Sequence, residues 1–261
     1  MKSLPPLDMH AHVSPDTTPE DLEKYGAVVF AATRSLHEAE AVLTRRDAVT
    51  IWGVGCHPGL VGAQRSFSES AFASALHSTP YVSEIGLDGS SRVDMGVQIA
   101  TLTSILKVAA DNPRLLAIHS FDATSRVLDV IEQGGARGVI LHWWLGDEHE
   151  TKRAVRLGCY FSVNFSMVSR YERMTLIPTD RMLTETDHSS GDRFSPRPRQ
   201  PGRVQPAEAS VASSRGMTTD QFRRQVWKNF VTLVGTVAPV TKLMPVAVQR
   251  MIQYAETLPA D

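Results

Sequence analysis

The feature that most constrains the fold of this chain is a repeated unit. In each unit a short run of β-branched or aromatic residues is followed by a polar turn and then by a stretch with helical spacing. Most of the apolar runs are nearly continuous rather than alternating, as in strands that are buried on both faces. The eight predicted strands span Leu4–Asp8, Ala27–Thr33, Val49–Cys56, Tyr81–Leu87, Leu115–His119, Gly138–His142, Cys159–Asn164 and Arg181–Asp187.

Amphipathic helices are predicted between these strands, because apolar residues recur at spacings of three and four. They span Ser35–Arg45, Phe67–His77, Val97–Asn112, Ala123–Gln133 and Glu148–Leu157. No glycine-rich nucleotide-binding motif follows the first strand, which argues against an open doubly wound sheet. The sequence therefore predicts an α/β fold, a (β/α)8 TIM-like barrel, as a single domain over residues 1–235.

The region after the eighth predicted strand differs in composition. Residues 188–217 combine clustered prolines with several arginines, which predicts a long loop over the mouth of the barrel. Helical spacing resumes over Thr218–Val234. A further amphipathic helix is predicted over Pro245–Leu258, within a C-terminal helical extension (236–261) that packs on the barrel or on a partner.

Charge and cysteine content narrow the functional classes. The formal net charge is -1, which argues against a protein that grips duplex nucleic acid mainly by bulk charge. Two cysteines, Cys56 and Cys159, cannot form a disulfide framework and favour a reducing compartment. No secretory signal is recognised, and the longest apolar stretch (230–240) is too short to cross a bilayer. We therefore expect a cytoplasmic protein without a membrane partner.

Histidine and acidic side chains gather where the predicted strands end. In a parallel barrel these carboxyl ends share one face, so residues far apart in the sequence converge there. Unpaired ionisable groups packed that closely are costly unless a cation joins them. The residues at these strand ends are Asp8, His10, His12, Cys56, His57, Glu84, Asp88, His119, His142 and Asp187. The convergence of four imidazoles and two carboxylates on one point predicts a metal centre.

Spacing strengthens some of these candidates more than others. His10 and His12 are separated by one residue on an extended segment, so both rings point to the same side and can chelate one ion. Glu84 can bridge two ions, with Gly86 leaving room for close approach. Considered one at a time, His119 and His142 could equally well be histidines packed in the core, and Asp187 could be the N-cap of a turn. Considered together, these residues are better explained as metal ligands.

At these residues the chain resembles the TatD family of metal-dependent hydrolases and deoxyribonucleases. The matching motifs are Asp8-Met9-His10-Ala11-His12, Gly55-Cys56-His57-Pro58, Glu84-Ile85-Gly86-Leu87-Asp88, the strand-end His119 and His142, Thr184-Glu185-Thr186-Asp187 and the late Asn229. They span roughly residues 7 to 232. Further details, such as Leu141-His142-Trp143 and the segments 86–90, 158–164 and 183–187, look like the TatD-like nuclease of the Qat anti-phage system.

The resemblance implies a TIM-like barrel of the metal-dependent hydrolase type. It also implies a site with two divalent metal ions, whose identity as Mg, Mn or Zn the sequence leaves open. It assigns His10, His12 and Asp187 to one ion, Glu84 to a bridge between the ions, and His119 and His142 to the other. His57 would then face a phosphate or support the ligands, and Asp8 would orient the histidines.

Three departures from the family pattern accompany this assignment. Ser120-Phe121 stands where many relatives carry a polar group, and Leu145-Gly146 replaces the usual Ser-Gly. His188 follows the final aspartate in place of a small residue, and is interpreted as an additional ligand, a general acid or an exposed side chain.

The implied function is metal-dependent hydrolysis of a phosphodiester, with Glu84 and Asp187 as catalytic residues and Asp187 as the proton acceptor. The expected substrate is DNA, single-stranded or at its ends, with Trp143 stacking a base and His57, His188 and Arg197 contacting the substrate. The arginines can equally belong to a solvated loop, and Trp143 and Trp144 to the core.

Two other functions remain open at this stage. One is a metallohydrolase of a small amide, lactone or phosphoester, since fold and metal site do not fix the substrate. The other is a scaffolding or regulatory subunit that acts with other proteins of a defence complex.

Overall fold

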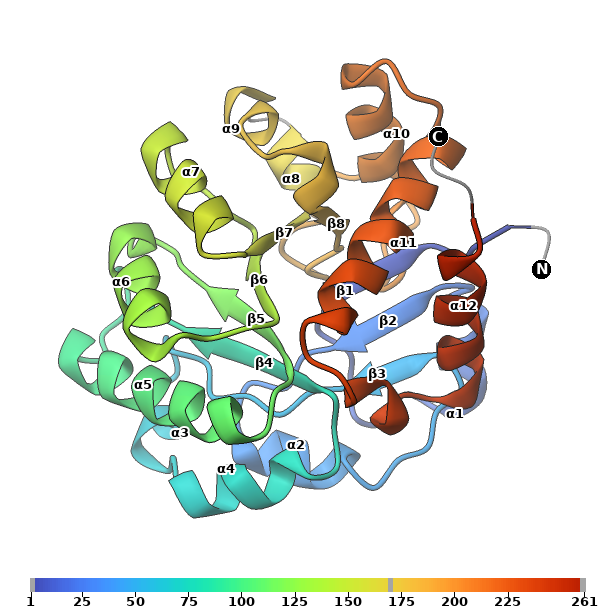
Figure 1. Ribbon diagram of the computed structural model, residues 1–261. Coiled ribbons are helices and arrows are strands. Elements are labelled where there is room, and N and C mark those ends of the chain that lie inside the picture. Colours follow the sequence, from blue (N-terminus) through green and yellow to red (C-terminus); the bar gives the residue numbers. More distant parts are fainter. Residues whose placement is uncertain (1–2, 169–170, 259–261) are drawn as a thin grey trace.

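The strands of the molecule lie at its centre, with helices around them (Figure 1). The computed structural model describes residues 3–168 and 171–258, and in this part of the chain the eight predicted strands are all present, most of them shorter than expected. They are β1 (Leu7–Ala11), β2 (Val28–Ala31), β3 (Thr50–Trp52), β4 (Tyr81–Gly86), β5 (Leu115–His119), β6 (Val139–His142), β7 (Tyr160–Val163) and β8 (Met182–Thr184). Neighbouring strands pair in parallel, so the predicted α/β barrel is confirmed.

The ring of strands has two irregular junctions. Regular pairing runs through β1–β2–β3 and separately through β4–β5–β6–β7–β8. The first junction, between β3 and β4, is bridged at Val54 and Val82. The second lies between β8 and β1, where the backbone N–H of Asp187 donates to the carbonyl oxygen of His10 at 2.8 Å. Both junctions contribute candidate metal ligands.

Helices follow most of the strands and cover the outside of the barrel (Figure 1). The α-helices are α1 (Pro19–Lys24), α2 (Leu36–Val42), α3 (Val61–Arg65), α4 (Glu69–Leu76), α5 (Met95–Asp111), α6 (Thr124–Gly134), α7 (Glu148–Arg156), α8 (Phe165–Val168), α9 (Tyr171–Thr175), α10 (Gln205–Ser214), α11 (Thr219–Gly235) and α12 (Val246–Glu256). Two short 3-10 turns, η1 (Thr179–Arg181) and η2 (Val240–Leu243), complete the elements. In the described segments no helix is both long enough and apolar enough to span a membrane.

Side-chain caps explain where several helices begin. Ser35 and Ser68 accept hydrogen bonds from backbone N–H groups in the first turns of α2 and α4. Asp147 and Thr218 form complete capping boxes at α7 and α11. The longer predicted helices are confirmed, whereas α1, α3, α8 and α9 are too short to show a helical period in the sequence.

The prediction of one long loop over residues 188–217 is wrong in its second half. Residues 205–214 form α10, and Pro206 occupies the first turn, where a helix does not use the missing N–H. Val211 and Ala212 bury its inner face, and the buried Glu208 pairs with Arg223 of α11. The proline that suggested a loop is therefore part of a helix start.

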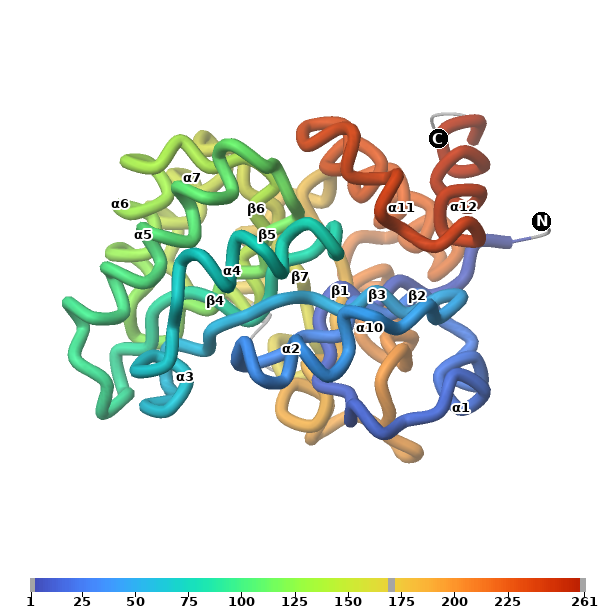
Figure 2. Tube along the Cα trace, turned by 90° about the horizontal axis from the view of Figure 1, so that it is seen from below, coloured from blue at the N-terminus to red at the C-terminus, as the bar shows by residue number. Residues whose placement is uncertain are grey.

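The C-terminal helix packs on the barrel rather than standing free. Helix α12 contacts α11 through the buried side chains of Val248, Ile252 and Ala255. Figure 2 shows the two helices side by side at one end of the molecule, next to the N-terminal residues. The last three residues of the predicted 236–261 extension, and residues 1–2, lie outside the described part.

The backbones at the β3–β4 junction are tightly packed, and this packing can be tested by a glycine substitution. A Cβ atom added at Gly55 would overlap with the backbone nitrogen of Glu84 and the backbone oxygen of Thr33. We expect Gly55→Ala to lower the free energy of unfolding by about 1–3 kcal/mol, because over-packing pushes these backbones apart. Urea denaturation measures the change.

The matched control is Gly62→Ala in α3, where an added Cβ meets nothing within 4 Å. This substitution should leave stability unchanged or raise it by about 0.5–1 kcal/mol through helix propensity. Equal stabilities of the two variants would contradict the predicted crowding at Gly55.

Candidate metal centre

A cluster of histidines and carboxylates lies at the carboxyl ends of the strands. All six residues predicted as ligands lie in this cluster, and His57 joins them. The members are His10 and His12 at the end of β1, His57 after β3, Glu84 on β4, His119 on β5, His142 on β6 and Asp187 after β8.

The Glu84 carboxylate lies at the centre of the cluster. Its oxygens lie within 4.0 Å of a ring nitrogen from each of five histidines, namely His10, His12, His57, His119 and His142. The shortest separation is 3.0 Å, between Glu84 Oε1 and His119 Nδ1. At the edge of the cluster, Asp187 Oδ1 lies 3.6 Å from His12 Nε2.

Three groups of side chains are close enough to share an ion. In each group one candidate ligand atom per residue lies within 4.8 Å of the others. The groups are His10, Glu84 and His142; His10, His12 and Asp187; and His57, Glu84 and His119. Imidazole nitrogens mixed with carboxylate oxygens suit Zn²⁺ and Mn²⁺ as well as Mg²⁺.

Buried polar atoms without partners show that these residues fit a divalent cation. Across residues 3–168 and 171–258, the cluster atoms that are buried and lack a hydrogen-bond partner are His10 Nε2, His12 Nδ1, Glu84 Oε2, His119 Nε2 and both ring nitrogens of His142. A buried polar atom left unpaired costs about 1–3 kcal/mol. Coordination would satisfy lone pairs that point into the cluster, which explains why so many are gathered there.

The two carboxylates of the cluster have opposite pKa shifts. Burial alone would raise the pKa of Glu84, but the close imidazoles of His119, His12 and His142 outweigh it and hold that pKa well below its usual range. Burial, followed by the charge of Glu84, raises the pKa of Asp187 to about 7. Asp187 is thus the more basic of the two carboxylates.

The His10 ring is held by residues that the sequence analysis did not identify. Its Nδ1 atom lies 3.1 Å from Ser83 Oγ and 3.4 Å from Tyr81 Oη. Burial, followed by the charge of His142, lowers the pKa of His10 well below its usual value, so the ring is neutral, the form that binds a metal. Both partners were visible as polar residues inside an otherwise apolar strand.

Asp8 holds His10 through its backbone, and no hydrogen bond from Asp8 to a histidine ring is found among the described residues. Its carboxylate accepts hydrogen bonds from the backbone N–H groups of His10, Thr186 and Gly202 and from the Thr186 hydroxyl. Burial raises the pKa of Asp8 to about 6, against the opposing effect of these hydrogen bonds. Asp8 therefore ties the end of β1 to the segment after β8.

Glu185 supports the turn after β6, a role that the sequence analysis missed. Its buried carboxylate accepts hydrogen bonds from the backbone N–H of Trp143 at 3.1 Å, from Asn164 Nδ2 at 2.9 Å and from the Ser162 hydroxyl. Trp143 has φ 42°, in the left-handed region that a bulky residue rarely adopts. Glu185 thus holds a strained residue beside His142.

A hollow of about 700 Å³ opens from the cluster to the surface, and we call it the mouth hollow. Its outer part is lined by an aromatic rim, defined here as Phe121, Trp143, Arg193 and Phe194. The Arg193 guanidinium lies over the Trp143 ring at 5.4 Å and over the Phe194 ring at 5.0 Å. Phe194 is 65% exposed and Phe121 is 45% exposed, so the rim presents apolar surface next to the cluster, as ligand-binding grooves do.

Some of the residues predicted to contact the substrate line the mouth hollow, and others do not. Trp143 lines the mouth hollow, whereas Trp144 is buried and donates its Nε1–H to Thr151. Arg197 is not among the described residues that line the hollow, and Arg193 takes that place. His188 also lies outside this lining, and its Nδ1 is 2.7 Å from Asp192 Oδ2.

Comparison with known proteins gives a consistent result. The model of the family described as TatD related DNase matches residues 7–235. A relative in Erwinia billingiae (strain Eb661), the 3'-5' ssDNA/RNA exonuclease TatD, is 27% identical over 178 residues, which cover 64% of this chain and 68% of that protein.

Two crystal structures share the fold at low sequence identity. The TatD homolog YJJV from Escherichia coli k12 superposes with a TM-score of 0.75 and 19% identity, covering 87% of this chain and 96% of the other. A hydrolase TatD family protein from Entamoeba histolytica has a TM-score of 0.72 and 13% identity, covering 89% and 99% of the two chains.

Metal binding can be tested without an activity assay. We expect a chelator to lower the melting temperature of the purified protein, because ions bound only by the folded state stabilise it. Glu84→Gln should at least halve the metal content measured by elemental analysis, since Glu84 belongs to two of the three ligand groups.

His149→Ala provides the control, because His149 is exposed on α7, outside the three ligand groups. Its metal content should equal that of the unmodified chain. A Glu84→Gln variant with full metal content would show that this cluster is not where the ions bind.

Proposed function

The chain belongs to the family of TatD related DNases, metal-dependent hydrolases of ester bonds, and from this premise we propose that it degrades single-stranded DNA from an end. The observation that carries the proposal is the buried Glu84-centred cluster, which opens into a hollow with an aromatic rim. The relative named as an ssDNA/RNA exonuclease supports a nucleic-acid substrate.

We assign the ligands as two overlapping sets. His10, His12 and Asp187 would hold one divalent ion, His119 and His142 the other, and Glu84 would be shared. His57 lies with Glu84 and His119 and is assigned as a further donor in place of its predicted substrate contact. Bound divalent ions would supply positive charge for the phosphate oxygens and lower the pKa of water at the site.

Asp187 is assigned as the proton acceptor. Both carboxylates are buried, yet their surroundings move their pKa values apart, and Asp187 is the more basic. It also lines the mouth hollow, where a water molecule and the scissile phosphate can meet. Glu84 acts through its central carboxylate, which keeps the histidine rings of both sets in place.

The aromatic rim favours unpaired bases over a duplex. Stacking of a base on an aromatic side chain contributes about 1–3 kcal/mol and requires that the base be free of its stack. Arg193 lies between two rim rings, so its guanidinium can contact the backbone phosphate next to a stacked base.

The reaction is tested by incubating the protein with single-stranded DNA, duplex DNA, RNA and a generic small phosphodiester, each with Mg²⁺, Mn²⁺ or Zn²⁺. We expect hydrolysis of single-stranded DNA, and Asp187→Asn should lower kcat by about 100-fold or more because the proton acceptor is lost. Asp16→Asn, on the exposed loop before α1, is the control. A folded, metal-loaded protein that cleaves no phosphodiester would refute the proposal.

The rim is tested separately by Phe194→Ala. We expect KM for single-stranded DNA to rise about tenfold from the lost stacking, with kinetics on the small phosphodiester unchanged. Val97→Ala is the matched control, because Val97 is 45% exposed on α5 and does not line the mouth hollow. Equal effects of Phe194→Ala on both substrates would contradict a base-stacking role.

The substrate panel also separates the alternatives. Activity confined to the small ester would favour a metallohydrolase of small substrates, and activity that appears only with an added protein would favour a subunit of a complex. An association with the Qat anti-phage system, protein partners in defence and a cytoplasmic location stay predictions from the sequence.

A further inference from the structure

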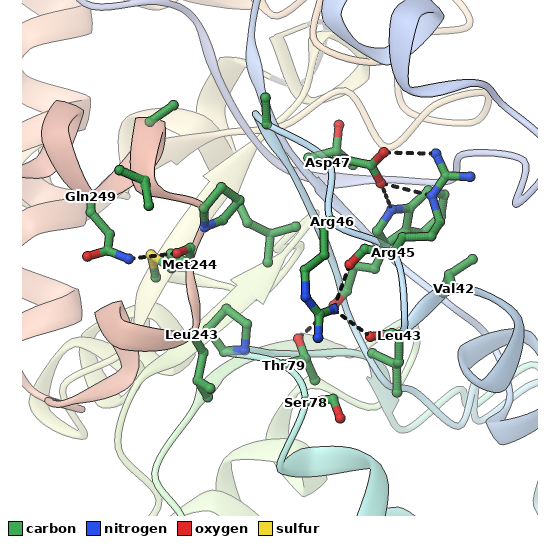
Figure 3. A pocket seen from close by; sticks show the side chains of 18 of the residues that line it. Val42, Leu43, Arg45, Arg46, Asp47, Ser78, Thr79, Leu243, Met244 and Gln249 are labelled. Atoms are coloured by element: carbon green, nitrogen blue, oxygen red, sulfur yellow. Dashed lines mark hydrogen bonds and ion pairs between the residues drawn. The ribbon is translucent and has the colours of Figure 1, made fainter.

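A second hollow, of about 690 Å³, lies at the opposite end of the barrel, and we call it the basal hollow (Figure 3). Its lining includes Thr50, the first residue of β3, and Pro80, directly before β4. The basal hollow is therefore at the amino ends of the strands, whereas the metal cluster is at their carboxyl ends. The two hollows share no lining residue.

One wall of the basal hollow comes from outside the family match. That match ends at residue 235, whereas η2 and the start of α12 supply lining residues from 242 to 249. The hollow is thus closed by a segment that lies beyond the residues matched by the family model.

The lining carries an excess of positive charge. Arg45 is paired with Asp47 at 2.8 Å, and Asp47 also accepts a hydrogen bond from Trp52 Nε1. Arg46 and Lys242 make no ion pair with any carboxylate in the part of the chain that is described. Arg46 donates only to the carbonyl oxygens of Leu43 and Arg45, and Figure 3 shows its side chain in the centre of the lining residues.

Apolar side chains and one unsatisfied hydroxyl complete the lining. Leu243 and Val246 are 37% and 62% exposed at the C-terminal wall, beside the buried Ile51. The Thr50 hydroxyl is buried and has no hydrogen-bond partner among the described residues. A polar group in that state is stabilised when a ligand reaches it.

We propose that the basal hollow binds a small organic phosphate with an apolar body, of the nucleoside monophosphate class. Arginine and lysine are the side chains that bind phosphates. Arg46 and Lys242 line one hollow, and neither forms an ion pair with a carboxylate of the described residues. The apolar wall supplies the surface on which a base or another flat group packs. The volume falls in the range of about 300–1,000 Å³ typical of small-molecule sites.

The proposal is tested by titrating the full-length protein with deoxyadenosine monophosphate, deoxyadenosine and inorganic phosphate by calorimetry. The nucleotide should bind more tightly than either fragment. The double variant Arg46→Glu/Lys242→Glu should weaken its binding at least tenfold, because two attractive charges become repulsive. Both side chains are exposed, so the fold should persist, and a thermal melt checks this.

Two further variants locate the binding. Arg156→Glu makes one such charge reversal at an exposed arginine on α7 and should leave nucleotide affinity unchanged. Glu84→Gln weakens any binding of the nucleotide at the metal cluster, so the binding that remains in this variant should come from the basal hollow at the other end of the barrel. Loss of binding in Glu84→Gln with retention in the double variant would overturn the proposal, as would equal affinity for inorganic phosphate and nucleotide.

Discussion

The convergence of five imidazoles on the Glu84 carboxylate is the interaction on which the rest of the structure depends. A buried carboxylate needs compensation, and here nitrogens from four strands or strand ends surround it. The backbone of the same residue also closes the barrel, because Glu84 N–H donates to Thr33 and its carbonyl oxygen accepts from Cys56. Movement of the β3–β4 junction therefore displaces the centre of the metal site, which links the closure of the fold to its chemistry.

The second junction of the barrel joins structure and site in the same way. Asp8 accepts hydrogen bonds from the backbone of His10, Thr186 and Gly202, so the end of β1 and the end of β8 are held at a fixed spacing. His10 and Asp187 are then brought into one ligand group. Asp187 has φ 41°, a conformation that costs energy for a non-glycine residue and persists only when its surroundings determine it. Trp143, with φ 42°, also lines the mouth hollow, whereas the third described non-glycine residue with positive φ, Asp122, does not. Two of the three strained residues thus lie at the site, as expected where a site is preorganised.

The positions of the ligand candidates could be predicted because a parallel barrel places all carboxyl ends of its strands on one face. That rule needs only the strand boundaries, and it predicted that His119 and Asp187 lie in the cluster without knowledge of side-chain directions. Contacts that depend on packing between distant segments could not be predicted. The choice of Arg193 instead of Arg197 at the mouth depends on how one loop folds back, and the hold of Glu185 on Trp143 spans 42 residues. Helix α10 was missed for a local reason, since proline signals both a loop and a helix start.

The near-zero net charge leaves the recognition of a substrate to local charges. The cluster at the carboxyl ends holds carboxylates that call for cations, and the cations would leave that end able to receive a phosphate. Long-range attraction to DNA is then weak, and under the proposed function recognition would come from short-range contacts with the ions and the aromatic rim. Such contacts require a flexible, unstacked strand that can enter the mouth hollow. A rigid duplex meets neither requirement, so a chain with a net charge of -1 is better suited to a free DNA end than to the side of a helix.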